Sequence, residues 1–225
     1  ELHHNPGKNV LFAATTVTAL ARLLERDEAP VRATLEAARR KLRAARDVRP
    51  TPLVDRARYA AWNGMMAGAV LHAAAALDDG RAREHALATL RRMRAESPEA
   101  DAVPHTPGGI GGLLDDQVHT AAAALDAYES TGDAAWLEWA LAIMSRVWRD
   151  YLDPEAGGLF DASRDRGGEG LLPARARPIQ DAPTPSGNGT AGIVAARLHA
   201  HTGDAAWDRR AQSLAEAFAG RGAEL

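Results

Sequence analysis

Three aspartates stand ahead of alanine-rich segments that we expect to be helical, and carboxylates placed in this way could perform acid–base chemistry. Their sequence contexts are Asp55 ahead of Trp62-Asn63-Gly64, Asp116 within Asp115-Asp116-Gln117, and Asp181 ahead of Ser186-Gly187-Asn188. Carboxylates that face one another across an apolar mouth can serve as general acid and general base toward a glycosidic or hemiacetal centre. We therefore take Asp55, Asp116 and Asp181 as candidate catalytic residues.

The alternative role for acidic and hydroxyl side chains in these positions is helix capping. The first turn of a helix leaves backbone N–H groups without partners, and Asp and Ser side chains commonly accept hydrogen bonds from them. We expect this role for Asp115 and Ser186. Because one cap per helix is enough, Asp55, Asp116 and Asp181 remain available for chemistry.

Aromatic and amide side chains close to these aspartates could hold a sugar. Trp62 and Phe160 offer faces on which a sugar ring can stack, although core packing is the commoner use of aromatic residues. The side chains of Asn63, Gln117 and Asn188 could form hydrogen bonds with sugar hydroxyls. All five are candidate ligand-binding residues.

His119 and Asp161 complete the candidate ligand-binding set. His119 lies one helical turn after Asp115, where it could act as an acid or a base. Asp161 ends the glycine-rich segment Gly157-Gly158-Leu159-Phe160-Asp161, which we interpret as a tight loop turn because it lacks the Lys-Ser/Thr ending of a phosphate-binding loop. The histidine spacings favour no metal site, so we expect neither a metal nor another cofactor.

A repeated turn defines the elements that must position these residues. The sequence Thr-Gly-Asp-Ala-Ala-Trp occurs at 131–136 and again, unchanged, at 202–207, and a degenerate copy occupies 77–81. In such a turn glycine ends one helix in a left-handed conformation and aspartate caps the next. Each copy therefore predicts a helical hairpin.

Each predicted hairpin joins an apolar helix to an amphipathic one. Residues 62–77 are apolar nearly all round, which predicts a helix buried on every side, whereas residues 81–94 place apolar side chains on one face only. The same alternation recurs in 118–128 with 136–151, and in 188–198 with 207–218. Two earlier helices, starting at Thr15 or Thr16 and at Pro30, bring the expected number to about eight.

Buried helices that alternate with half-exposed ones are typical of an α/α toroid, in which an inner ring of helices packs inside an outer ring. An α-solenoid is the alternative. Long Gly- and Pro-rich connections at 97–114 and 153–185 favour the toroid, because loops gathered at one end of a ring can build a site. We predict one all-α domain over residues 1–225, forming an incomplete ring or the C-terminal part of one.

Composition narrows the possible functions. The 225 residues are 46% hydrophobic, include no cysteine and have a formal net charge of -3. Without cysteine, disulfides, thiolate nucleophiles and iron–sulfur clusters are excluded. Interspersed charges argue against nucleic-acid binding. No apolar run approaches the ~20 residues of a spanning helix and no signal peptide is evident, so we expect no membrane association and a cytoplasmic location.

Several motifs occur in a fixed order that resembles one family. They are Gly7-Lys8-Asn9-Val10-Leu11, Trp62-Asn63-Gly64-Met65, Leu114-Asp115-Asp116-Gln117, Tyr128-Glu129-Ser130-Thr131-Gly132-Asp133, Gly157-Gly158-Leu159-Phe160-Asp161 and Pro185-Ser186-Gly187-Asn188. In this order they resemble the C-terminal region of thioredoxin-domain-containing proteins of the spermatogenesis-associated type.

The resemblance implies an α/α toroid like that of six-hairpin glycosidases and N-acylglucosamine 2-epimerases. It also implies an upstream thioredoxin-like domain, which we expect to be lacking from these residues and to be a partner of them. Two hypotheses follow. The chain is a sugar-binding or sugar-converting toroid with a small sugar-like ligand, or it is a non-catalytic helical module that supports the thioredoxin-like domain.

Overall fold

The computed structural model describes residues 12–111, 113–166 and 175–219, which fall into two compact units, 1–55 and 56–225. The histidine pair at 3–4 and the first family motif, at 7–11, lie outside the described residues. Each unit is a separate helical body. The single domain expected for residues 1–225 stays a prediction.

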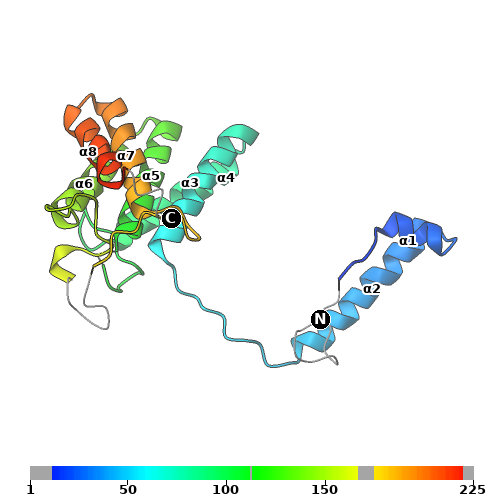
Figure 1. Cartoon of the computed structure of the whole chain (residues 1–225). Coiled ribbons are helices and arrows are strands. Elements are labelled where there is room, and N and C mark those ends of the chain that lie inside the picture. The colour runs from blue at the N-terminus through cyan, green and yellow to red at the C-terminus, as the bar shows by residue number, and fades with distance from the viewer. Residues whose placement is uncertain (1–11, 112, 167–174, 220–225) are drawn as a thin grey trace. The chain divides into compact units, whose positions relative to one another are not determined.

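The first unit is a helical hairpin of α1 (Val17–Leu23) and α2 (Glu28–Asp47), which lie side by side (Figure 1). The hydroxyl of Thr16 accepts a hydrogen bond from the Ala19 N–H at 3.2 Å and so caps α1. The hydroxyl of Thr18 donates to Glu28 at 2.9 Å and ties the two helices together. Helix α2 is the helix expected at Pro30, and it begins two residues earlier, at Glu28.

The described residues of the second unit form three helical hairpins with one 3₁₀ turn, η1 (Arg164–Arg166), between the second and the third (Figure 1). The inner helices α3, α5 and α7 lie next to one another in that order, and each is covered by its hairpin partner. The hairpins are α3 (Ala60–Leu77) with α4 (Gly80–Glu96), α5 (Leu114–Thr131) with α6 (Ala134–Asp150), and α7 (Gly187–Thr202) with α8 (Ala205–Phe218).

The two-layer arrangement confirms an all-α fold of the toroid type. The described residues form eight α-helices, as expected, and no strand occurs among them beyond four isolated bridges. Three inner helices covered by three outer ones make an arc of a ring. Short turns join the helices of each hairpin at one end of this unit, and the described parts of the long loops 97–113 and 151–186 gather at the other (Figure 1).

The repeated turn has the predicted geometry in both copies. Gly132 and Gly203 adopt left-handed φ angles of 71° and 72°, and each donates its N–H to the helix that it ends. Asp133 then accepts a hydrogen bond from Ala135 at 3.0 Å, and Asp204 accepts one from Ala206 at 2.8 Å. In the degenerate copy Asp78 takes the left-handed position and Asp79 caps α4. The hairpin prediction is confirmed.

Helix α3 is not buried on every side, contrary to expectation. One face packs on α4 and α5, but Trp62 is 61% exposed and Met66 is 66% exposed on the other face. Among the inner helices that the structure describes, only the central one, α5, has another inner helix on both flanks. Among the described helices α3 alone also has the length and composition of a membrane span, with a mean hydropathy of 1.2 over 18 residues. The expectation that no apolar run approaches span length is therefore wrong for α3.

Candidate functional site

The N-terminal ends of the three inner helices meet at the aspartate pair of α5. The carboxylate of Asp116 accepts a hydrogen bond from the Ala61 N–H of α3 at 3.0 Å. On the other side α7 approaches so closely that a Cβ atom on Gly187 would lie 2.6 Å from Asp115 Oδ1. The two neighbouring carboxylates therefore contact different helices, and together they mark the centre of the loop end.

The carboxylate of Asp116 is buried, and each of its two oxygens has a hydrogen-bond partner. Its side chain is 1% exposed, Oδ1 accepts the Ala61 N–H, and Oδ2 lies 2.9 Å from His105 Nδ1 in the loop 97–113. Burial raises the pKa of the Asp116 carboxyl, although the hydrogen bonds from His105 and Ala61 act in the opposite direction. His105 is 30% exposed, so its ring connects this buried carboxylate to the protein surface.

Asp115 is half-buried, and its carboxylate accepts no hydrogen bond from the described part of the chain. Burial raises the pKa of Asp115, and the nearby charge of Asp161 adds to that effect while His119 opposes it. The expected cap is wrong here, because Leu113 occupies the N-cap position and Asp115 lies inside the first turn. Ser186 does cap its helix, with its hydroxyl accepting the Gly189 N–H at 3.0 Å.

His119 lies one turn along α5 from Asp115 and is buried. Its Nε2 atom has no hydrogen-bond partner among the described residues. Burial lowers the pKa of His119, while Asp115 and the backbone of Pro185 favour the charged form. Burial therefore favours the neutral form of the His119 ring.

Aromatic rings extend from the aspartate pair toward solvent. The Trp62 ring lies 4.9 Å from Tyr59 in an edge-on arrangement, and Tyr59 lies 5.0 Å from His105. A continuous path of contacts thus joins the exposed Trp62 to the buried Asp116. Neither Tyr59 nor His105 is among the candidate residues named from the sequence. His105 stands between Pro104 and Thr106-Pro107 in a loop, a setting that could have drawn attention to it.

The three candidate amide side chains bind the protein's own backbone. Gln117 accepts the Val103 N–H at 2.9 Å and donates to the Val103 carbonyl at 2.7 Å. Asn188 makes the same pair of bonds with Leu159, at 2.7 and 2.9 Å. Asn63 donates to the Tyr59 carbonyl at 2.8 Å and lines a pocket of about 20 Å³, room for little more than one water molecule. Gln117 and Asn188 thus hold loops in place, whereas Asn63 bonds the N-terminal end of its own helix.

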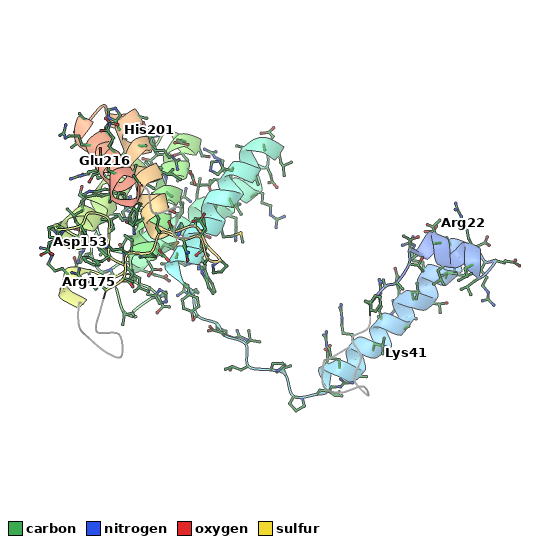
Figure 2. The ribbon with its side chains drawn as sticks, viewed as in Figure 1. Arg22, Lys41, Asp153, Arg175, His201 and Glu216 are labelled. Atoms are coloured by element: carbon green, nitrogen blue, oxygen red, sulfur yellow. The ribbon has the colours of Figure 1, made fainter. Side chains whose placement is uncertain are left out.

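Phe160 and Asp161 lie in the second long loop, where each has a partner. The Arg175 guanidinium sits 4.0 Å from the centre of the Phe160 ring, which covers one stacking face. Asp161 accepts the Ala176 N–H at 3.0 Å, and its own carbonyl accepts the Leu114 N–H at 2.9 Å. Figure 2 shows Arg175 at the loop end of this unit and His201, near the end of α7, at the opposite end.

Asp55 and Asp181 differ in setting from Asp116. Asp55 is the exposed last residue of the first unit, whereas Asp116 belongs to the second. Asp181 is exposed and accepts the Ser186 N–H at 2.8 Å, which fixes the start of α7. The structure brings Asp115, Asp116, His105 and His119 together, and the catalytic roles of Asp55 and Asp181 stay predictions. No group of three potential metal ligands occurs within the described ranges.

We expect Asp115→Asn to raise the melting temperature at pH 7 to 8, with a smaller gain at lower pH. The pKa of Asp115 is higher in the folded protein than in the unfolded chain, where it is near 3.8. Ionisation of Asp115 therefore lowers the stability of the fold as the pH rises through the folded-state pKa. Asparagine does not ionise, so the variant avoids this loss of stability. Thermal unfolding between pH 4 and 8 measures the difference, with Glu138→Gln, at an exposed position of α6, as control. A lower melting temperature for Asp115→Asn at pH 7 would contradict the assignment.

The fold is an α/α toroid of the kind found in glycoside hydrolase family 76. An inactive variant of an α-1,6-mannanase from Salegentibacter sp. HEL1_6, in complex with α-1,6-mannotriose, matches 72% of this chain and 47% of its own, with a TM-score of 0.58 at 20% identity. A family 76 mannosidase from Bacteroides thetaiotaomicron matches 71% and 43%, with a TM-score of 0.53 at 16% identity. These matches confirm the fold.

The similarity of sequence is to spermatogenesis-associated protein 20. The chain is 31% identical to the human protein over 229 residues and 31% identical to the mouse protein over 237 residues. These matches cover 96% and 98% of the chain, which spans 29% of the length of either relative. The resemblance to the spermatogenesis-associated type is thereby confirmed. No protein-family model matches the chain.

Proposed function

We propose that this chain forms the carbohydrate-binding face of a glycosidase-like toroid and that Asp115 is its acid–base carboxylate. The observation on which the proposal rests is the pair of adjacent carboxylates at the start of the central inner helix. One of them is held by two hydrogen bonds, and the other has no hydrogen-bond partner in the described structure and a raised pKa. A carboxyl that keeps its proton at higher pH can protonate a departing glycosidic oxygen.

The mannanase provides independent support for this choice of residues. Its inactive variants have two consecutive aspartates replaced, by asparagine in one case and by alanine in another. Consecutive aspartates occur in this chain at 78–79 and at 115–116. The first pair forms the turn between α3 and α4, at the end away from the long loops. The second pair lies at the loop end, beside Trp62 and Tyr59.

We assign different roles to the two aspartates. Asp115 is half-buried beside His119 and is the carboxyl able to reach a bound sugar. Asp116 is too buried for direct contact and acts through His105, whose ring it orients. The exposed face of Trp62 supplies a stacking surface for a sugar ring. The ligand class is a neutral oligosaccharide, with α-1,6-mannotriose as the first probe.

Calorimetric titration with α-1,6-mannotriose, and hydrolysis assays on this chain and on the full-length protein, test the proposal. Asp115→Asn is expected to reduce the rate of hydrolysis by a factor of about 10² or more. Asp116→Asn is expected to reduce both the rate of hydrolysis and the stability of the protein. Asp78→Asn, from the other aspartate pair, is the matched control and should retain full activity. Equal activity of Asp115→Asn and Asp78→Asn would exclude the assigned site.

A second candidate function is a helical interaction module, and the exposed apolar face of α3 favours it. Trp62, Met66 and Leu77 are all exposed on that helix. In this interpretation Asp116 and Ser186 serve structure alone. Failure of both this chain and the full-length protein to bind mannotriose, together with protection of the Met66 side chain from oxidation in the full-length protein, would favour it over the sugar site.

A further inference from the structure

A cavity of about 270 Å³ lies behind the loop 97–111, apart from the aspartate pair. Its wall is formed by this loop, by the first turn of α5, by the C-terminal end of α6 and by residues 163–165. Asp115, Trp62 and His119 are not among its lining residues. The cavity is therefore distinct from the carbohydrate site proposed above.

Two buried hydroxyl groups line this cavity. Tyr151 is 2% exposed and Ser163 is 6% exposed, and both residues form part of the wall. Neither side-chain hydroxyl has a hydrogen-bond partner in the ranges that the structure describes. Burial raises the pKa of the Tyr151 phenol, so it stays a neutral donor and acceptor. Both hydroxyls are therefore open to the cavity, where water or a ligand can form hydrogen bonds with them.

Carboxylates outnumber guanidinium groups at the cavity. Arg146 lines the wall, and its guanidinium pairs with Glu99, with Asp101 at 2.8 Å and with Asp150 at 3.3 Å. A free anion would meet a guanidinium already surrounded by carboxylates, and Glu99 and Asp165 also line the wall. A cation would face Arg146 at short range. The lining therefore suits a neutral ligand that both donates and accepts hydrogen bonds.

We propose that this cavity binds a small neutral polyol, of the size of one monosaccharide or less, through the hydroxyls of Tyr151 and Ser163. Polyols present donors and acceptors on the same atoms, and these match the two protein hydroxyls. The apolar walls of Val103 and Pro104 cover the remaining surface of such a ligand. This inference goes beyond the carbohydrate function of the aspartate pair and does not depend on it.

Titration of the intact chain with D-mannose and with glycerol, followed by NMR, tests the proposal. The amide signals of Gly109 and Gly111, both in the wall, are expected to shift in a saturable way. Tyr151→Phe and Ser163→Ala should each weaken binding about three- to tenfold, the usual effect of one lost hydrogen bond. Tyr128→Phe is the matched control, because Tyr128 packs against His201 away from the cavity, and it should bind normally.

Acetate and guanidinium serve as charged probes in the same titration. The proposal would be overturned if the amide signals of Gly109 and Gly111 shifted with either ion but not with the polyols. It would also be overturned if these signals shifted with neither polyol. Unchanged affinity in Tyr151→Phe and Ser163→Ala would overturn it too. Asp115→Asn should leave these signals unaffected, so failure of the aspartate site and failure of the cavity site give different results.

Discussion

Replacing Asn188 by alanine is expected to lower the free energy of unfolding by about 3 to 4 kcal/mol. The Asn188 side chain accepts the Leu159 N–H at 2.7 Å and donates to the carbonyls of Leu159 and Pro178 at 2.9 and 2.8 Å. Leu159 is completely buried, so water cannot replace these bonds. Each buried backbone group left without a partner costs about 1 to 3 kcal/mol.

Urea unfolding measures the effect, and two further variants make the result interpretable. Asn188→Asp keeps an acceptor for the Leu159 N–H but sets an oxygen against two carbonyl oxygens, so it should lose at least as much stability as alanine. Gln212→Ala removes an exposed amide of α8, which donates only to Asp208, and should change stability by less than about 0.5 kcal/mol. A loss below 1 kcal/mol for Asn188→Ala would show that the loop is held by other contacts.

The role of Asn188 illustrates what the sequence does not reveal about the three amides. Gln117, Asn188 and Asn63 occur in the first turn of an inner helix, close to aspartates, and that pattern is compatible with sugar binding. In the structure Gln117 and Asn188 bind the loops ahead of their helices, because Val103 and Leu159 come back to lie beside those first turns. The helical periodicity of a sequence does not predict which helix a long loop will pack against.

Hairpins and turns were predictable because their causes are local. The Thr-Gly-Asp turn needs a residue that tolerates a positive φ, followed by a side chain that caps the next helix, and Gly132 and Asp133 meet both needs. The start of α5 was less predictable. A hydrogen bond from Leu114 to the distant Asp161 carbonyl helps to fix that start, and it places Asp115 inside the helix instead of at its cap.

Burial of the inner helices depended on neighbours that the sequence pattern does not report. Helix α3 has the composition of a surrounded helix, yet one of its faces is exposed because only α4 and α5 pack against it. The contacts of His105 with Asp116 and Tyr59 likewise join segments that are distant in sequence. Asp116 and His119 could be named as candidates from the sequence, whereas the contacts of His105 became visible only in the fold.

Replacing Gly64 by alanine is expected to lower the free energy of unfolding by about 2 to 3 kcal/mol, because α3 and α5 pack backbone to backbone at this point. A Cβ atom on Gly64 would lie 2.9 Å from the carbonyl oxygen of His119 and 3.1 Å from the nitrogen of Thr120. Both are backbone atoms of a helix that is held on two sides, so they cannot rotate away as a flexible side chain could. The two helices must move apart, and the hydrogen bond between Ala61 and Asp116 must lengthen with them.

Gly80→Ala provides the control for the Gly64 variant, since both positions are helical and the substitution is the same. A Cβ atom on Gly80 would meet nothing within 4 Å, so alanine at the first position of α4 should leave stability unchanged or raise it by up to about 1 kcal/mol. Urea unfolding of the two variants isolates the contact between α3 and α5 from the general preference for alanine in helices. Equal stability of Gly64→Ala and Gly80→Ala would mean that α3 and α5 can separate without cost, and the Asp116 carboxylate would then lose its fixed position.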